Sequence, residues 1–572
     1  MTTTVPPSGT ASSDAEGHDA RARGDAAAAD APRRRLRSNV VVPLAVALWF
    51  FVLGSVWAIS SPTPAAIDEP THYIKALATA QGQLIGVHAP APNDLHDLPL
   101  TKIVEDQASR AFMVPAALAP DGVYSCNAGS LEKPATCSAG TRCQRYLAQC
   151  TGDRLGHTGL VREVSYDGEY EPTLYLLPGL LADMANNDVN GMRAARMGGV
   201  ITGTVFIGLA AALLWERRRS AYALLGLLLA VTPMVAHLSA SVNPSGGEIV
   251  LAICWFAGLL RLVREPAPGA RWVWLAVGVS GGLLGFSRAL GFVWVIAGLL
   301  FAALLLGVPA TWRRIRARGG YAWAAVALVV AGVVMDQVWW KVVVGPIHYP
   351  RPLSDARHYL LNQFNGLPTW FSEQVGVFGW GDVHMNAIQY VIWSVMAVAL
   401  VTVALLVGTR RQRAVLSAMV VADVIGTVLL AAYTRIAFGY PSGGMEGRYV
   451  LPFTVMVVLL AGEVIRERSH VLGDLAPRRM LLYLAAGGIF VQLSALWLNA
   501  RRYAVGIDGP LMFLGHSLWA PPFGWAPWIV LGLLDAALLV AVVLFAARGG
   551  VGPENPRSAT LAPGDWTGGP PR

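Results

Sequence analysis

Two adjacent carboxylates and a histidine follow the first long apolar segment of the chain, at Asp68, Glu69 and His72. A carboxylate placed there can act as a general base, and its neighbour can help to hold a divalent ion such as Mg²⁺ or Mn²⁺. His72 lies four residues after Asp68, so on a helix the two share one face, where the imidazole can orient a group or bind a metal. The competing interpretation is structural, with the acids capping a helix that begins near Pro70.

Single arginines stand at the ends of several other apolar segments, at positions 193, 196, 288, 435 and 448. A charge at this depth is costly, so each arginine is either functional or an anchor that reaches to the lipid headgroups. Arg288 and Arg448 lie in turns that contain glycine, which favours a specific role over simple anchoring. Because a planar guanidinium suits a phosphate diester, these two are candidate phosphate-binding residues.

The elements that must position these residues are membrane spans. Hydrophobic residues make up 54% of the 572 residues and charged residues only 14%, with a mean hydropathy of +0.48. This composition excludes a soluble globule, a disordered chain, a coiled coil and a small disulfide scaffold. Apolar runs of about 20 residues predict an all-α membrane protein with about twelve transmembrane helices, near 40–60, 197–215, 221–239, 249–263, 272–287, 289–308, 321–344, 388–408, 414–433, 449–465, 480–498 and 526–546.

The net charge of +8 gathers on alternate loops rather than on one patch. The loops on the side of the two termini, together with both tails, hold 26 Arg, no Lys and 11 acidic residues. By the positive-inside rule both termini are cytoplasmic, and the basic charge faces lipid headgroups, so no nucleic-acid partner is expected. The predicted organisation is a disordered tail over 1–39, a membrane domain over 40–546 and a second disordered tail over 547–572.

One predicted extracytoplasmic loop, residues 61–193, is far longer than the others and is therefore expected to be functional. Segments that begin near Pro70 and Tyr170 are amphipathic and predict two interfacial helices on the outer leaflet. The loop also carries four of the five cysteines, whose location outside the cytosol predicts two disulfides of unknown connectivity. A zinc site is the alternative, although no Cys-x-x-Cys pair is present. The four cysteines are Cys126, Cys137, Cys143 and Cys150.

Four sequence blocks share their order and their placement relative to the spans with a known family. The blocks are Asp68-Glu69-Pro70-x-His72, Glu171-Pro-Thr-Leu-Tyr-Leu-Leu-Pro, Thr232-Pro-Met to Asn243-Pro-Ser, and Glu446-Gly-Arg-Tyr-Val-Leu-Pro452. Within about residues 40–465 they resemble the signature blocks of an uncharacterised bacterial membrane family, domain of unknown function 2142. That family is grouped with the GT-C glycosyltransferases, so the resemblance implies a GT-C-like fold.

The resemblance implies an enzyme of the bacterial cytoplasmic membrane that works on its outer face. It would transfer a sugar from a polyprenyl-phosphate donor to a glycan or glycolipid acceptor of the cell envelope, surrounded by membrane lipids. In such folds an acid of the first outer loop is the base, which corresponds to Asp68 or Glu69, and a basic residue holds the donor phosphate, which corresponds to Arg448 and less securely to Arg288. Residues 88–165 depart from the shared blocks and are interpreted as an insertion. Candidate substrate-binding residues are His72, Asn243, Glu446 and Tyr449.

Two other classes of function remain open from the sequence. Acids inside predicted spans are typical of transporters and lipid flippases, and this chain has four. They do not fall in one corresponding pair of broken helices, which speaks against transport. A scaffold for envelope assembly without catalysis is the third class. The four acids are Asp336, Asp423, Glu463 and Asp535.

Overall fold

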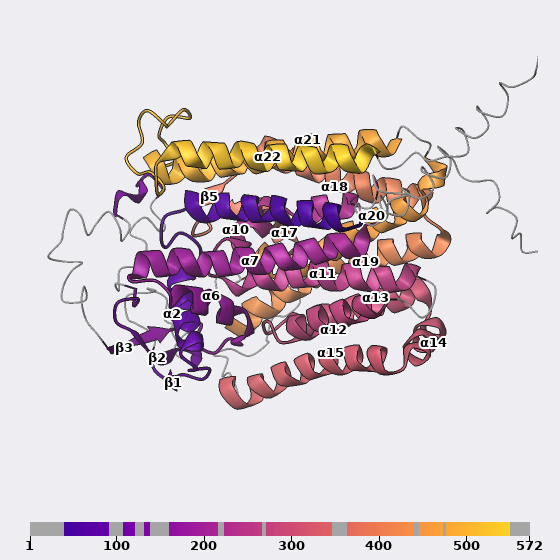
Figure 1. Cartoon of the computed structure of the whole chain (residues 1–572), viewed down its shortest axis with the longest axis horizontal. Helices are drawn as coiled ribbons and strands as arrows, with labels where there is room; N and C mark the ends of the chain where they lie inside the picture. Colours follow the sequence, from indigo (N-terminus) through magenta and orange to yellow (C-terminus); the bar gives the residue numbers. More distant parts are fainter. Residues whose placement is uncertain are drawn as a thin grey trace, which may run out of the picture.

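The computed structural model describes residues 39–90, 107–120, 131–137, 159–215, 222, 224–265, 270–345, 363–438, 445–472 and 476–548. Most of the predicted tails, and Cys126, Cys143 and Cys150, lie outside these residues, and the side chain of Cys137 is not described, so the disulfide prediction is not tested. The described helices run side by side as one bundle (Figure 1).

Eight of the described helices are long and apolar enough to cross a membrane, or nine if one bent pair counts as a single span. The chain is therefore a multi-pass membrane protein, but the prediction of twelve transmembrane helices is not confirmed. The eight are Asn39–Ser60, Asp188–Leu214, Pro244–Arg264, Gly320–Val344, Ala387–Val407, Arg410–Thr434, Arg478–Val505 and Trp525–Ala547. In Figure 1 they correspond, after the first helix, to α7 (Asp188–Leu214), α11 (Pro244–Arg264), α15 (Gly320–Trp339) with η4 (Trp340–Val344), α18 (Ala387–Val407), α19 (Arg410–Phe438), α21 (Ala476–Val505) and α22 (Trp525–Arg548).

The other four predicted spans are broken or short, for reasons visible in the sequence. Pro233 cannot continue a helix, so the third is divided into α9 (Leu225–Ala230) and α10 (Pro233–Ser239). The fifth, α12 (Arg271–Gly285), ends before a Phe-Ser-Arg turn. The sixth, α13 (Gly291–Leu306), bends by 101° into α14 (Val308–Arg318) at Gly307, whose φ is 96°. The tenth, α20 (Leu451–Glu467), has 17 residues.

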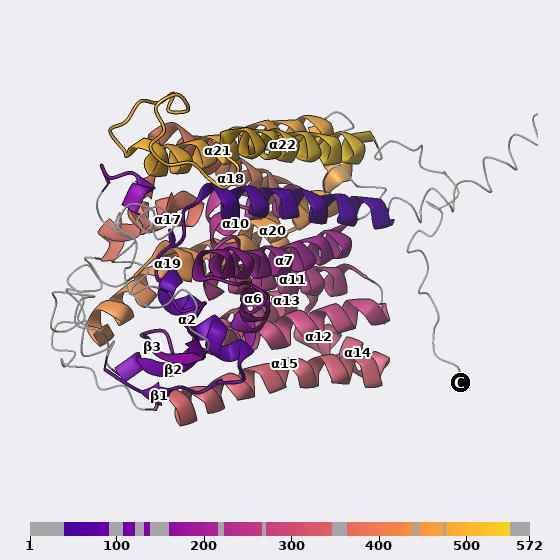
Figure 2. The same cartoon turned by 60° about the vertical axis from the view of Figure 1, so that its left-hand side comes forward.

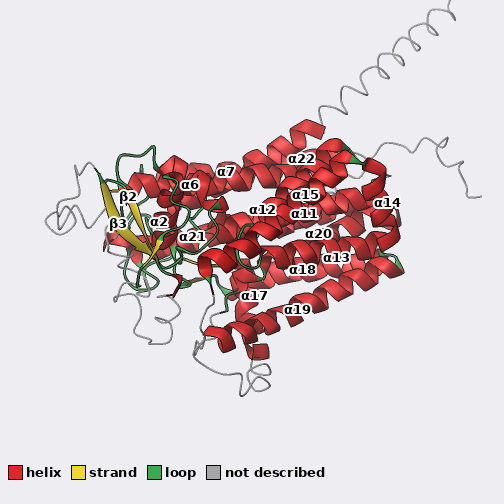
Figure 3. Ribbon diagram, turned by 90° about the horizontal axis from the view of Figure 1, so that it is seen from below, coloured by secondary structure: helices red, strands yellow, loops and turns green. Residues whose placement is uncertain are grey.

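The first loop builds a compact layer on one end of the bundle, which we call the sheet end (Figures 2 and 3). It contains α2 (Glu69–Ala80), η2 (Thr173–Tyr175) and α6 (Leu176–Ala182). It also contains an antiparallel sheet that the all-α prediction missed, with β2 (Arg110–Pro115) between β1 (Val87–His88) and β3 (Leu160–Ser165). The segment Ala135–Cys137, η1, belongs to the same loop.

The two predicted interfacial helices have different environments. In α2, every residue from Glu69 to Thr79 is buried, so this helix packs inside protein rather than on a lipid surface, which corrects the prediction. In α6, Leu176 and Leu180 are exposed while Pro178, on another face, is buried, as expected of an interfacial helix.

The remaining short elements connect the spans. They are η5 (Phe364–Gly366), α17 (Leu367–Gly376), the hairpin β4 (Val377–Phe378) with β5 (Val383–His384), η6 (Gly447–Tyr449) and η7 (Ser469–Val471). The first helix begins, and α22 ends, at the bundle end opposite the sheet, which we call the terminal end (Figure 2). The start of the first helix and the end of α22 therefore lie on one side of the bundle.

Candidate functional site

The turn that carries Asp68 is fixed by buried side chains from two distant helices. Arg196 of α7 donates hydrogen bonds of 2.6–3.0 Å to three backbone carbonyls at the end of the first helix and just after it. Asn499 and Tyr503 of α21 donate to a serine hydroxyl and a backbone carbonyl of the same stretch. Asp68 itself has a left-handed backbone with φ of 60°, which Asp tolerates better than most residues. The backbone that carries the Asp68 side chain is therefore held in one conformation.

Glu69 accepts hydrogen bonds from several donors at both of its carboxylate oxygens. Arg196 forms two hydrogen bonds of 2.7 Å with its two carboxylate oxygens, and the backbone amides of Ala65, Ala66 and Val242 donate to the same oxygens. Burial alone would raise the pKa of Glu69, but the charge and hydrogen bonds of Arg196 outweigh it and lower the pKa. The prediction of Glu69 as a catalytic or metal-binding residue is therefore not supported, because all of its acceptor capacity stabilises the fold.

Asp68 has fewer partners than Glu69. The hydroxyl of Tyr166 donates to its Oδ1 over 2.9 Å, and a guanidinium nitrogen of Arg448 lies 3.5 Å from its Oδ2. The side chain is 29% exposed, whereas that of Glu69 is fully buried. Of the two predicted bases, Asp68 is thus the one that retains free lone pairs and access to solvent.

Arg448 comes from η6, far along the chain, yet its guanidinium faces Asp68. Its Nε lies 2.6 Å from a carboxylate oxygen of Glu446, and its guanidinium carbon lies 5.5 Å from the centre of the Tyr449 ring. Burial raises the pKa of Glu446, and the charge of Arg448 opposes that rise. The three predicted residues of this block therefore form one group beside Asp68.

Arg288 approaches the same group from the turn between α12 and α13. It donates to the Ser245 hydroxyl over 2.7 Å and lies 3.5 Å from Glu248. Its guanidinium lies between the rings of Tyr170 and Tyr449, 5.3 and 5.4 Å from their centres. Since Tyr449 contacts both arginines, the two predicted phosphate-binding residues belong to one site.

Asn243 is near this site but serves its framework. Its Oδ1 accepts a 2.9 Å hydrogen bond from the Ser245 amide, which caps the start of α11, and its Nδ2 donates to the Ile67 carbonyl. It thereby connects the residue before Asp68 to the helix that carries the partners of Arg288. These bonds give Asn243 a positioning role.

His72 faces an acid that the sequence did not single out. Its Nδ1 lies 3.5 Å from Oδ2 of Asp167 and 2.9 Å from the Tyr175 hydroxyl. Burial, together with the positive charges of Arg288 and Arg448, holds the pKa of His72 well below its usual value, so the ring is neutral at pH 7.

Asp167 is the functional candidate that sequence reasoning missed. Burial and the nearby carboxylate of Asp68 raise its pKa well above the usual value. Its Oδ2 has no hydrogen-bond partner among the described residues. The available signal was the run Tyr166-Asp-Gly-Glu-Tyr-Glu171, which alternates acids with aromatics directly before a recognised block.

A buried lysine holds the backbone next to Asp167. Lys75 of α2 is fully buried and donates to the carbonyls of Gly168 and Leu84 over 2.9 and 2.8 Å. Burial lowers the pKa of Lys75 to about 7, against the opposing effect of Glu171, and burial raises the pKa of Glu169 to about 7. Lys75 therefore ties helix α2 to the loop that supplies the missed acid.

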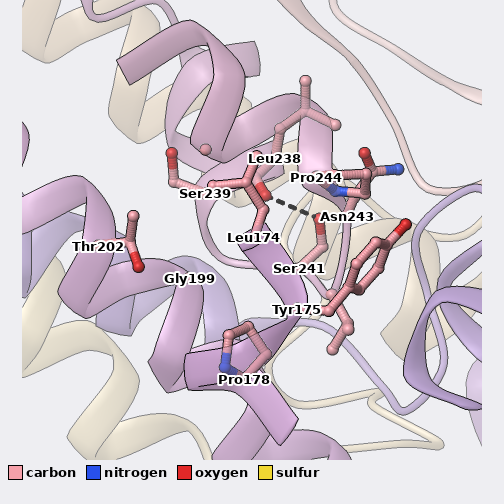
Figure 4. Close-up of a pocket in the computed structure, with 12 residues that line it drawn as sticks. Leu174, Tyr175, Pro178, Gly199, Thr202, Leu238, Ser239, Ser241, Asn243 and Pro244 are labelled. Carbon is pink, nitrogen blue, oxygen red and sulfur yellow. Dashed lines mark hydrogen bonds between the residues drawn. The ribbon is translucent and has the colours of Figure 1, made fainter. Parts of the chain in front are cut away.

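A small cavity lies behind Tyr175 and Asn243, between α6, α7, α10 and α11 (Figure 4). Its volume of about 20 Å³ is enough for one water molecule. Ser241 on its wall donates to the Leu238 carbonyl, while the hydroxyl of Ser239 has no partner among the described residues. This space is too small for a sugar or a phosphate, so it is not the substrate site.

The four acids inside predicted spans do not share one environment. Asp423 accepts a hydrogen bond of 2.9 Å from Thr454, and Glu463 is paired with Arg466. Asp336 is fully buried and shares a hydrogen bond with Glu171 of the first loop, besides accepting one from Gln337. Asp535 is buried in the last span, beside Trp49 of the first helix. The four acids thus have four different partners, which favours structural roles over a common ion path, and Asp336 also connects its span to the first loop.

The geometry thus brings Asp68, His72, Arg288, Glu446, Arg448 and Tyr449 together at the sheet end, adds Asp167, and separates Glu69 from them. A partly exposed carboxylate, two arginines that can hold an anion, and aromatic rings converge from segments that are hundreds of residues apart. The side chain of Arg435 lies outside the described part of the chain.

Comparison with known proteins gives a family match and similar solved structures. The family model described as predicted membrane protein (DUF2142) matches residues 50–457. Two structures of ArnT from Cupriavidus metallidurans, bound to undecaprenyl phosphate and in the apo state, each share 14% identity over 89% of this chain and 77% of theirs, with TM-scores of 0.42 and 0.39. Because these TM-scores are low, neither likeness carries an argument about this chain. No curated protein matches it.

Proposed function

Because the chain belongs to the DUF2142 family of predicted membrane proteins, we propose that it is a glycosyltransferase of the bacterial cytoplasmic membrane, with both termini in the cytoplasm. It takes a sugar from a polyprenyl-phosphate donor and transfers it to a glycan or glycolipid acceptor of the cell envelope. The single observation that carries the proposal is the convergence of Asp68 with Arg448 and Arg288 at one end of the bundle.

The proposed roles follow from the contacts of each residue. Asp68 takes the proton of an acceptor hydroxyl, whose oxygen then forms a bond to the anomeric carbon of the donor sugar. The bond between that carbon and the phosphate oxygen breaks, and the polyprenyl phosphate leaves with the electron pair. Arg448 and Arg288 bind the leaving phosphate, where charge increases most in the transition state. Displacement from the opposite face inverts the sugar.

Removal of the base tests this function. Asp68→Asn is nearly isosteric and keeps the Tyr166 contact, so the protein should fold and insert normally, while transfer should fall by about 10²–10⁴-fold. The assay supplies purified protein in lipid with labelled polyprenyl-phosphate sugars and scores sugar transfer to envelope material. Asp183→Asn is the matched control, since Asp183 is an exposed acid at the same end of the bundle whose side chain accepts a hydrogen bond from Gln81. Parental transfer by a well-folded Asp68→Asn variant would exclude the proposed base.

A further inference from the structure

Three potential ligand groups from the first loop lie close together at the proposed site. One ligand atom each from Asp68, His72 and Asp167 can be chosen so that all three lie within 4.8 Å of one another. Such spacing lets one ion touch all three atoms. Asp68 and His72 come from one turn of α2 and its cap, whereas Asp167 comes from the loop after β3.

One buried oxygen of Asp167 is a second observation, besides the spacing, that points to a bound ion. Asp167 is only 8% exposed, and its Oδ2 lacks a hydrogen-bond partner among the described residues although it points at His72. A buried carboxylate oxygen without a hydrogen-bond donor is costly, and the nearby carboxylate of Asp68 repels that of Asp167. A bound cation would remove both penalties at once.

The surrounding residues prepare the imidazole for such a role. The Tyr175 hydroxyl bonds to Nδ1 of His72, and Tyr170 stacks on the ring with 5.8 Å between ring centres. The stacking limits rotation of the ring, and a cation bound at Nδ1, the nitrogen that also faces Asp167, takes the place of the Tyr175 hydrogen bond. Lys75 fixes the backbone beside Asp167. All three side chains are thus held in place by neighbours that are not themselves ligands.

We propose that Asp68, His72 and Asp167 bind one divalent cation through two carboxylates and one imidazole. Asp167 takes the place that sequence reasoning gave to Glu69, whose oxygens are occupied by Arg196 and by backbone amides. Two hard oxygen ligands and one nitrogen leave coordination positions for water or for a phosphate oxygen, and they suit Mn²⁺ or Mg²⁺. The partial exposure of Asp68 keeps the open side of the ion accessible.

Binding of Mn²⁺ to the purified full-length protein tests the proposal without any donor or acceptor. Titration followed by electron paramagnetic resonance should show one bound Mn²⁺ per chain, with a ¹⁴N coupling from one histidine, and Mg²⁺ should compete. Asp167→Asn should weaken binding at least tenfold, and His72→Gln should remove the nitrogen coupling. Asp183→Asn, outside the group, should bind Mn²⁺ as the parent does.

The outcomes separate this proposal from the proposed function. Absence of Mn²⁺ binding at millimolar concentration, or equal binding by a folded Asp167→Asn variant, would overturn the metal site. Thermal unfolding of each variant in the same detergent establishes that it is folded. The Mn²⁺ titration is independent of the sugar-transfer assay. Bound Mn²⁺, together with absent transfer in that separate assay, would refute the glycosyltransferase and leave the metal site intact.

Discussion

Acid–arginine groups lie at both ends of the bundle, and they are built differently. At the terminal end, both oxygens of Glu463 accept hydrogen bonds of 2.7 and 2.8 Å from Arg466, while Arg264 donates to the last carbonyls of α7. At the sheet end, Asp68 lies 3.5 Å from Arg448 and keeps an exposed edge. The first group connects helix ends and leaves no carboxylate oxygen without a partner, whereas in the second group Asp68 can still accept hydrogen bonds from a ligand.

Saturation, rather than location, is what distinguishes the two kinds of group. Glu69 and Arg196 lie at the sheet end, next to Asp68, yet they form a closed pair with a second set of backbone partners. A buried charge pair whose donors and acceptors are all used belongs to the framework of the fold, because removal of either partner leaves an isolated buried charge. Asp68, which has unused acceptors on a left-handed backbone, is for this reason the residue that we propose for binding or chemistry.

The largest expected effect is on the closed pair at the sheet end. Arg196→Met should destabilise the protein by about 3–5 kcal/mol, because it leaves the buried carboxylate of Glu69 without its counter-charge. The measurement is thermal unfolding and the monodisperse yield in detergent. The double variant Arg196→Met with Glu69→Gln should recover part of the loss, since it removes the isolated charge.

A different result for Glu69 alone would break the comparison. If Glu69→Gln unfolds at the parental temperature but loses sugar transfer as Asp68→Asn should, then Glu69 belongs to the chemistry and the assignment of a purely structural pair is wrong. We expect the reverse, with lost stability and a transfer rate per folded molecule close to that of the parent.

The next effect compares one arginine from each end. Arg448→Lys keeps the charge but loses the planar fork that can hold two phosphate oxygens, so donor affinity should fall about 10–100-fold, equivalent to one charge-assisted hydrogen bond. Arg466→Lys at the terminal end should leave donor affinity unchanged and lower the unfolding temperature. Binding of labelled polyprenyl phosphate measures the affinity of each purified variant, and thermal unfolding measures the stability of Arg466→Lys. Equal affinities would assign the phosphate to Arg288 instead.

Local patterns were enough to predict part of this site. Asp68, His72, Arg288 and Arg448 each stand at the end of an apolar segment, where a charge has a recognisable cost. The fate of Glu69 could not be predicted, because its partner Arg196 is 127 residues away and nothing in the local sequence pairs them. The local sequence could therefore single out these charged residues, whereas it could not show that a distant partner occupies all of the acceptors of Glu69.

The fold was predicted in outline and missed in its interruptions. Hydropathy identifies apolar stretches but does not detect a break such as the one before Pro233. A divided helix was therefore predicted as one span. The strand β2 pairs with β3 across 45 residues or more, and such pairing leaves little local trace. Asp167 lies just after β3. Because the sheet was not predicted, the position of Asp167 beside α2 was not predicted either.

The smallest effect comes from a matched pair of glutamates that neighbour the arginines of the two ends. Glu446 and Glu467 have side chains 32% and 30% exposed, and each is ion-paired with an arginine, Arg448 at 2.6 Å and Arg466 at 3.7 Å. Glu446→Gln weakens one charge-assisted contact that orients Arg448, so transfer should fall about fivefold, equivalent to roughly 1 kcal/mol. Glu467→Gln should change transfer less than twofold, because its arginine remains held by Glu463. Steady-state transfer by the two variants, normalised to folded protein, gives the comparison.

Faster transfer by Glu446→Gln would mean that Glu446 competes with the donor phosphate for Arg448. Equal rates for both variants would remove the distinction between an open and a closed group.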